Sequence, residues 1–208
     1  MLDSFSRNLV LCIGIIILLI IVGAFLPPFL LRLGYQQTAE LIYTFYSPLC
    51  HQLAFRSFFL FGEQSVYPRA LAGINNMLSY EDVTKNQALD LNEGRAFYGN
   101  KQLGYKIALC QRDLAIYSFI LVFILIYLLL QGKVTMLSVW VWVVVGLLPI
   151  AIDGGSQLFS IINFGISWLP IRESTPIMRV LTGAGFGFTT AWVLLPRLNQ
   201  YVHSNYKK

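Results

Sequence analysis

The sequence has few charged side chains. Asp, Glu, Lys and Arg make up 12 % of its 208 residues, and hydrophobic residues make up 56 %, whereas an ordinary soluble domain carries roughly 25 % charge. This composition excludes a soluble globular domain, a disordered chain and a coiled coil. Because the apolar residues gather in long runs, most of the chain is expected to lie in a lipid bilayer.

Basic runs and evident internal repeats are also missing. The net charge of +5 comes from scattered residues, so nucleic acid is not an expected partner. Four crossings without repeats provide little machinery for alternating access, so a transporter ranks third among the functions considered. Gly183-x-Gly185-x-Gly187 is not a dinucleotide fingerprint, because no strand precedes it. Gly183 and Gly187 instead predict a close-packing helix face.

Four apolar segments approach the roughly 20 residues that a helix needs to cross the hydrocarbon core. We therefore predict an all-α integral membrane protein with a single membrane domain over residues 1–208 and four transmembrane helices at about 9–26, 114–130, 136–152 and 176–195. Pro27-Pro28 and Pro196 are expected to end the first and last helices. The first segment is longer than the apolar core of a signal peptide, which favours a retained helix.

In this arrangement both termini and the 131–134 hinge lie on one side of the membrane. That side holds Arg7, Lys133, Arg197 and two terminal lysines against a single acid, Asp3. By the positive-inside rule we expect a multi-pass cell membrane protein with both termini in the cytoplasm. The long connections at 32–113 and 153–175 are then external.

The first of these connections divides into two parts. Residues 36–47 have apolar side chains at helical spacing and predict an amphipathic helix that Pro48 ends. The stretch 41–61 reads as a partly inserted, re-entrant hairpin, with a fifth crossing as the alternative. Residues 62–104 are polar and predict an external loop insertion with at most one short helix.

Polar residues outside this loop fall in four separate segments, all at the external end of the predicted bundle. Ionisable residues at membrane depth cost roughly 2.5–3.5 kcal/mol each and usually face a partner or a water-filled cavity. Their convergence predicts one polar site facing the outside. The candidate residues are Cys50, His51, Gln52, Arg56, Cys110, Arg112, Asp113, Asp153, Gln157, Arg172 and Arg179.

The same segments carry four motifs that resemble a family. These are Cys-His-Gln at 50–52 followed by Arg56-Ser57, Cys-x-Arg at 110–112 followed by Ile116-Tyr117, Asp-Gly-x-x-Gln at 153–157, and Arg-x-x-Thr-Gly at 179–183. In this order they resemble an uncharacterised prokaryotic family of integral membrane proteins, catalogued as a domain of unknown function. The resemblance runs from Pro48 onward, without the first helix and the insertion at 62–101. It implies the membrane placement and the grouping of these residues, and no activity.

The cysteine pair leaves three interpretations open, all of which require Cys50 and Cys110 to be neighbours, with Cα atoms within roughly 7 Å. One is a structural disulfide in an oxidising compartment. Another is a redox pair that exchanges electrons with a membrane quinone. A third is a thiophilic metal site made by Cys50, His51 and Cys110 with an acid, Asp113 or Asp153. Cys12 lies within the first helix and is expected to serve packing.

The arginines outnumber the nearby acids. Each acid is expected to pair with an arginine, so Asp153 should lie close to Arg112, Arg172 or Arg179. The alternative is an anionic ligand, such as the phosphate of a lipid head group.

Helix ends near these acids are also open to prediction. Asp113 is expected in the first turn of the second helix. If this helix begins near Lys106 instead, Cys110, Asp113 and Tyr117 share one face. Gly154-Gly155 would let the chain leave the third helix after Asp153, and 156–168 would form a short re-entrant segment.

The leading functional hypothesis is a small membrane protein whose outer polar site performs redox chemistry or binds a metal ion, a quinone, or another small anionic or lipid-soluble ligand. The alternative is a non-catalytic accessory subunit or scaffold of a larger membrane complex, in which the polar residues only lock the bundle.

Overall fold

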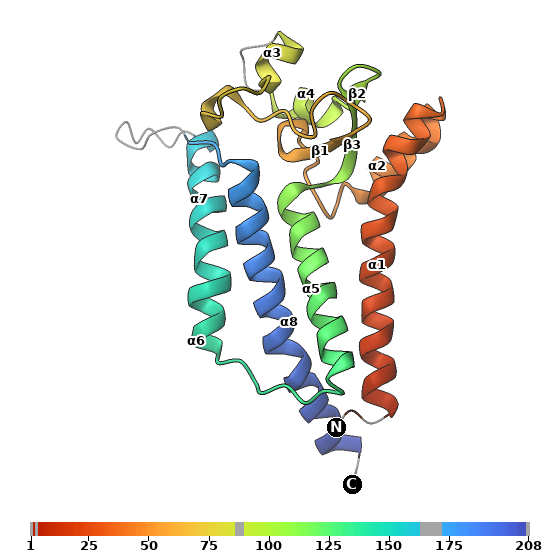
Figure 1. Cartoon of the computed structure of the whole chain (residues 1–208), viewed down its shortest axis with the longest axis vertical. Helices are drawn as coiled ribbons and strands as arrows, with labels where there is room; N and C mark the ends of the chain where they lie inside the picture. The colour runs from red at the N-terminus through yellow and green to blue at the C-terminus, as the bar shows by residue number, and fades with distance from the viewer. Residues whose placement is uncertain (1, 3, 86–89, 163–171, 207–208) are drawn as a thin grey trace.

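Four long apolar helices form the body of the protein (Figure 1). The computed structural model describes residues 2, 4–85, 90–162 and 172–206. Each of the four helices is long and apolar enough to cross a membrane, so the predicted four-helix integral membrane fold is confirmed. They are α1 (Ser4–Arg32), α5 (Gln111–Leu129), a composite of α6 (Val139–Val141), the π-helical η3 (Trp142–Leu147) and α7 (Leu148–Ile162), and α8 (Pro176–Tyr206).

The helices stand in a row in which α5 and α8 are central, α1 packs against α5, and the composite helix packs against α8 (Figure 1). Glycines bring the two central helices close together. A Cβ atom at Gly183 would lie 2.6 Å from the Arg112 carbonyl oxygen, and one at Gly187 would collide with the Ile116 carbonyl. The close-packing face predicted from these glycines is therefore confirmed. Large apolar side chains on the outer surfaces of α1 and the composite helix are exposed, as expected for surfaces in contact with lipid.

The prolines do not end the first and last helices, so the predicted ends at 26 and 195 are wrong. Pro27 and Pro28 lie inside α1, where both are buried, and α8 continues through Pro196 to Tyr206. A proline removes only its own N–H from the helix, and packing against neighbouring segments retains the rest of the structure. Near Pro196, the Arg197 guanidinium donates a hydrogen bond to the Val193 backbone carbonyl at 2.7 Å.

The third helix also continues beyond its predicted end. It passes through Gly154-Gly155 and ends at Ile162. A glycine pair permits the chain to leave a helix but does not require it, and the Asp153 carboxylate that suggested an end is instead paired inside the bundle. The predicted re-entrant segment at 156–168 is thus helical up to Ile162, and its remainder lies outside the described residues.

A cap of residues 50–110 covers one end of the bundle (Figure 1). It contains a small antiparallel sheet in the order β1-β3-β2, with a register that places Ser57 opposite Cys110. Buried aromatic residues, including Phe55, Phe59 and Tyr67, give it an apolar core of its own. Its elements are η1 (Ala54–Arg56), β1 (Ser57–Leu60), η2 (Ala70–Ala72), α3 (Tyr80–Thr84), α4 (Leu91–Ala96), β2 (Gly99–Asn100) and β3 (Gly104–Cys110).

The cap bears on three points of the sequence analysis. The predominantly helical fold carries one small sheet, since residues 104–110 form β3 where one alternative began the second helix near Lys106. Residues 41–61 do not form a fifth crossing, since they pass through a short 3-10 turn into β1. Residues 62–104 are more than a polar loop, because their buried aromatic residues pack into the core of the cap.

The amphipathic helix predicted at 36–47 is confirmed as α2 (Gln36–Tyr46). It buries Ala39, Tyr43 and Tyr46 against α1 and β3, while Leu41 and Phe45 remain exposed. The Tyr46 hydroxyl donates to the Ile20 carbonyl of α1 at 2.7 Å, which fixes the angle between the two helices.

Both chain ends lie at the end of the bundle opposite the cap (Figure 1). The polar residues at the start of α5 and α8 and at the end of the third helix are therefore on the cap side. An even number of crossings with the termini together matches the arrangement expected from the sequence. The side of the membrane to which this end belongs remains a prediction.

Candidate functional site

The junction of β3 and α5 positions the first thiol. Cys110 is the N-cap residue of α5, and its sulfur accepts a hydrogen bond from the Asp113 backbone N–H at 3.4 Å. The thiol also contacts the Asp113 side chain, since Cys110 Sγ and Asp113 Oδ2 are 3.1 Å apart. Asp113 lies in the first turn of α5, as predicted, where a carboxylate meets the positive end of the helix dipole.

The second thiol is brought to this junction by the end of α2. Cys50 follows Pro48, and its sulfur accepts hydrogen bonds from the backbone N–H groups of Cys110 at 3.2 Å and Gln52 at 3.4 Å. The predicted proximity of Cys50 and Cys110 is confirmed, because their sulfurs and an Asp113 carboxylate oxygen all lie within 4.8 Å of one another. Both cysteines are free thiols, so the disulfide interpretation does not describe this structure. A side-chain hydrogen bond with Cys110, together with burial, raises the pKa of the Cys50 thiol.

The two thiols open into a cavity of about 130 Å³, which we call the thiol cavity. Its walls come from the segment after α2, the start of α5 and the start of α8. Three of the lining side chains are arginines, and His51 is exposed at its edge. The lining residues are Cys50, His51, Gln52, Leu53, Arg56, Cys110, Arg112, Asp113 and Arg179.

Asp153 forms the centre of one ion-pair cluster behind this cavity. Its buried carboxylate pairs with Arg112 and, at 3.4 Å, with Arg172, and it accepts a hydrogen bond from the Ser174 hydroxyl at 3.0 Å. The predicted proximity of Asp153 to an arginine is therefore confirmed. Gln157 donates to the Asp153 backbone carbonyl at 2.8 Å one turn later. Gln157, Arg172 and Asp153 do not line the thiol cavity, and Arg112, which does, pairs with Asp153.

Glu173 forms the centre of a second cluster. Arg56 pairs with it through two hydrogen bonds of 3.0 and 3.1 Å, and Arg179 pairs with the same carboxylate. Arg179 is 1 % exposed and also donates to Gln111 Oε1 at 3.2 Å and to the Phe55 carbonyl at 3.3 Å. Neither Glu173 nor Gln111 was among the predicted site residues, although Glu173 lies next to Arg172 in a polar segment.

The two clusters leave an excess of positive charge around the thiol cavity. Four arginines share two carboxylates, and Asp113 makes no ion pair with an arginine among the described residues. Within the same part of the chain, the Nε groups of Arg112 and Arg179 are buried without a hydrogen-bond partner. The arginine charges therefore favour an anionic ligand in the cavity, whereas the Cys50 thiol itself is held neutral by its hydrogen bond with Cys110 and by burial.

Lys106 is a further buried cation that the sequence did not reveal. It lies on β3, and its Nζ donates to the carbonyls of Gln52 at 2.8 Å and Arg95 at 2.5 Å. The rings of Tyr43 and Tyr98 lie 5.6 and 5.1 Å from the same nitrogen. Burial lowers the pKa of Lys106 to about 7. A single lysine in a polar stretch is typical of an exposed loop, so no sequence signal marked it.

The fold and this site define a small integral membrane protein with four spanning helices and a polar, thiol-containing end. Residues 94–193 match the model of a family described as "Predicted membrane protein (DUF2085)". Over 197 residues, 91 % of this chain and 92 % of the relative, the chain is 24 % identical to the uncharacterised protein MJ1492 of Methanocaldococcus jannaschii. The expected resemblance to an uncharacterised membrane protein family is thereby confirmed. No solved structure shows significant similarity to the chain.

The region matched by the family model contains Cys110, Asp153 and Arg179 and begins after Cys50. It thus spans β3, α5, the composite third helix and most of α8. Neither the family description nor the relative's name states an activity, so the functional argument depends on the chemistry of the site.

Proposed function

We propose that this protein binds one thiophilic metal ion at the capped end of its membrane bundle, through Cys50, Cys110 and Asp113. The observation that carries the proposal is the mutual distance of at most 4.8 Å between two sulfurs and one carboxylate oxygen. Around a tetrahedral zinc ion with Zn–S bonds of roughly 2.3 Å, donor atoms lie roughly 3.5–4 Å apart. Small side-chain movements are therefore enough to enclose an ion. His51 lines the same cavity and is available as a fourth ligand after rotation of its side chain.

The charge distribution supports this donor set. Two thiolates and a carboxylate retain a negative charge after they bind a divalent ion. The surplus of arginines around the thiol cavity offsets that charge without contributing ligands of its own. In the metal-free protein the raised pKa of Cys50 keeps its thiol protonated, so binding should release protons and strengthen as the pH rises.

Titration of the purified, reduced chain with Co²⁺ tests the proposal, because thiolate–Co²⁺ bonds give a charge-transfer absorption. We expect one Co²⁺ per chain with this absorption, and displacement by Zn²⁺. Cys50→Ser and Cys110→Ser should abolish the band, and Asp113→Asn should weaken binding. Cys12→Ser provides the matched control, since this exposed cysteine lies in α1. Absence of the band, or equal loss in Cys12→Ser, would exclude the metal site.

The position of Cys110 supports a second candidate, reversible disulfide formation. Its sulfur caps the N-terminus of α5 and lies within 4.8 Å of the Cys50 sulfur, so the two thiols need to move little to form a bond. In the reaction Cys50 and Cys110 form an S–S bond and lose two electrons and two protons, which a membrane quinone takes up to become a quinol. A short-chain quinone should then block alkylation of both thiols and yield quinol in equal amount. Bound Zn²⁺ should instead block alkylation without quinol formation, and a chelator should reverse it.

The arginine clusters by themselves favour the accessory-subunit role. They join α5, the third helix and α8 to the cap, and a purely structural lock needs no more than that. If neither Co²⁺ nor quinone acts on the thiols, this role is the one that the site supports.

A further inference from the structure

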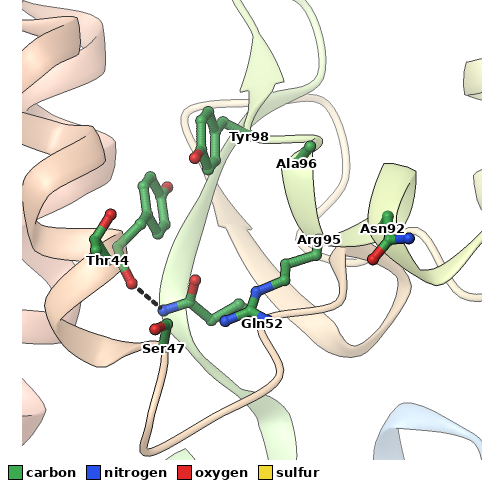
Figure 2. A pocket seen from close by; sticks show the side chains of 8 residues that line it. Thr44, Ser47, Gln52, Asn92, Arg95, Ala96 and Tyr98 are labelled. Atoms are coloured by element: carbon green, nitrogen blue, oxygen red, sulfur yellow. Dashed lines mark hydrogen bonds between the residues drawn. The ribbon is translucent and has the colours of Figure 1, made fainter.

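A second cavity shares only Gln52 with the lining of the thiol cavity, and Figure 2 shows its lining residues. It has a volume of about 310 Å³ and is formed between α2, Gln52 and the segment from α4 to β2. We call it the α2 cavity. Its lining residues are Tyr43, Thr44, Ser47, Gln52, Asn92, Arg95, Ala96 and Tyr98.

Cations without carboxylate partners surround the α2 cavity. Arg95 is exposed and extends from α4 toward Gln52 (Figure 2), and it forms no salt bridge within the described part of the chain. Lys106 lies directly behind the wall, because its Nζ donates to the backbone of two lining residues, Gln52 and Arg95. None of the eight lining residues is an acid. The charge on the wall of the cavity is therefore that of Arg95, while Glu40 and Asp90 lie next to the lining residues Thr44 and Asn92 without lining the cavity themselves.

Hydrogen-bond donors face the arginine across this cavity. Ser47, the residue that follows α2, lies on the side opposite Arg95, and Asn92 adds an amide (Figure 2), whereas the Thr44 hydroxyl already donates to the Glu40 carbonyl at 2.9 Å. Tyr43 and Tyr98 stack with ring centroids 4.5 Å apart and close one side. A forked guanidinium together with hydroxyl and amide donors matches the oxygens of a phosphate group.

The position of α2 indicates where such a group comes from. Thr44 borders the cavity, and the neighbouring Phe45 and Leu41 are 74 % and 71 % exposed. These apolar side chains belong to the exposed face of α2, and α2 packs against α1, which also carries exposed apolar side chains. An acyl chain along this surface would place its head group at the cavity.

We propose that the α2 cavity binds a phosphate group, with the head group of an anionic membrane lipid as its source. Arg95 makes the charged contact, and Ser47 and Asn92 orient the phosphate oxygens. This inference does not depend on the metal site, because it uses different residues and a different ligand.

Native mass spectrometry of the full chain in detergent tests the proposal. We expect dioleoyl phosphatidylglycerol to bind more tightly than dioleoyl phosphatidylcholine, which carries no net charge. Arg95→Gln should weaken phosphatidylglycerol binding about tenfold, the loss expected for a charge-assisted hydrogen bond. Arg95→Lys should retain part of the affinity, because it keeps the charge and loses the fork. Lys101→Gln, which removes an exposed cation in the turn before β3, should bind like the parent.

A competition experiment separates the two sources of phosphate. If millimolar inorganic phosphate displaces phosphatidylglycerol from the parent and binds Arg95→Gln less well, the site recognises the phosphate group of the lipid. If inorganic phosphate binds in this way but phosphatidylglycerol binds no better than phosphatidylcholine, the ligand is a soluble phosphate compound and the lipid assignment is wrong. Equal melting temperatures of the lipid-free parent, Arg95→Gln and Lys101→Gln confirm that folding is unchanged. If Arg95→Gln and Lys101→Gln lose the same affinity, or if neither phosphate nor phosphatidylglycerol binds preferentially, the proposal is wrong.

Discussion

Asp153 accepts contacts from Arg112, Arg172 and Ser174 while it is only 3 % exposed. A carboxylate at this depth is costly alone and stabilising only as part of a cluster. The same requirement made its arginine partners predictable from the sequence. The environment of Lys106 could not be predicted in this way, because the carbonyls and tyrosine rings around it come from segments far apart in the chain.

Asp153→Asn should destabilise the protein by about 3 kcal/mol, because it leaves the partly buried Arg112 without its counter-charge. Thermal unfolding in detergent measures the effect. Glu63→Gln, at an exposed position in the cap, should leave the melting temperature unchanged. A parent-like melting temperature of Asp153→Asn would mean that bulk water, and not the bundle, solvates this carboxylate.

Lys106 should make stability rise with pH. Its pKa is about 7 in the folded protein, below its ordinary value of 10.5, so the unfolded chain binds more protons between these two values. Between pH 7 and 8.5 this contributes about 1–2 kcal/mol of added stability. The window stops there because the raised pKa of Cys50 acts in the opposite direction at higher pH.

The melting temperature of Lys106→Met should consequently vary less with pH than that of the parent over this window. A parallel pH dependence of the two proteins would show that Lys106 titrates normally and is hydrated.

At the scale of elements, the close contact between α5 and α8 depends on glycines, which have no side chain to hold the two backbones apart. Gly187 faces the Ile116 backbone, whereas Gly155 in α7 faces open space, where an added Cβ would meet no other atom within 4 Å. Both lie in helices, where alanine is favoured over glycine by about 1 kcal/mol. Their surroundings alone decide the sign of a substitution.

Gly187→Ala should therefore destabilise the protein, because the helices must separate to admit the methyl group. Gly155→Ala should stabilise it by up to about 1 kcal/mol. The two melting temperatures, measured in the same detergent, should move in opposite directions. A shift of the same sign in both variants would contradict the close approach of α5 and α8.

The elements differ in how far the sequence predicts them. Apolar runs long enough for a bilayer identify four helices, and apolar side chains at helical spacing identify α2. The ends are less predictable, because Pro27-Pro28 and Pro196 are tolerated once neighbouring segments pack around them. The strand β3 is hidden, since Ile107-Ala108-Leu109 is apolar on both faces and adjoins a helix start.

At the scale of the whole molecule, the cap and the two chain ends lie at opposite ends of the bundle (Figure 1). The candidate site joins residues from segments separated by up to 129 positions, from Cys50 to Arg179. The grouping of these residues at one end of the bundle follows from the number of crossings, which can be predicted from the sequence. Their individual contacts depend on side-chain packing, which cannot be predicted from the sequence.

Orientation is testable with an impermeant thiol reagent. We expect a cysteine at position 101, from Lys101→Cys in the cap, to react in intact cells, and one at position 204, from Ser204→Cys, to react only after lysis. The Cys12→Ser chain without an added cysteine measures the background from Cys50 and Cys110. The reverse pattern would place the cap in the cytoplasm.

Gln52 borders both the thiol cavity and the α2 cavity, and it does so with a left-handed backbone (φ 55°) that non-glycine residues rarely adopt. Its amide N–H contacts Cys50, while its carbonyl accepts from Lys106. One peptide segment thus borders both cavities, and we expect a ligand that moves it in one cavity to change the affinity of the other. Such coupling is reciprocal by thermodynamic necessity: if a metal ion at the thiols tightens phosphate binding by some factor, phosphate tightens metal binding by the same factor.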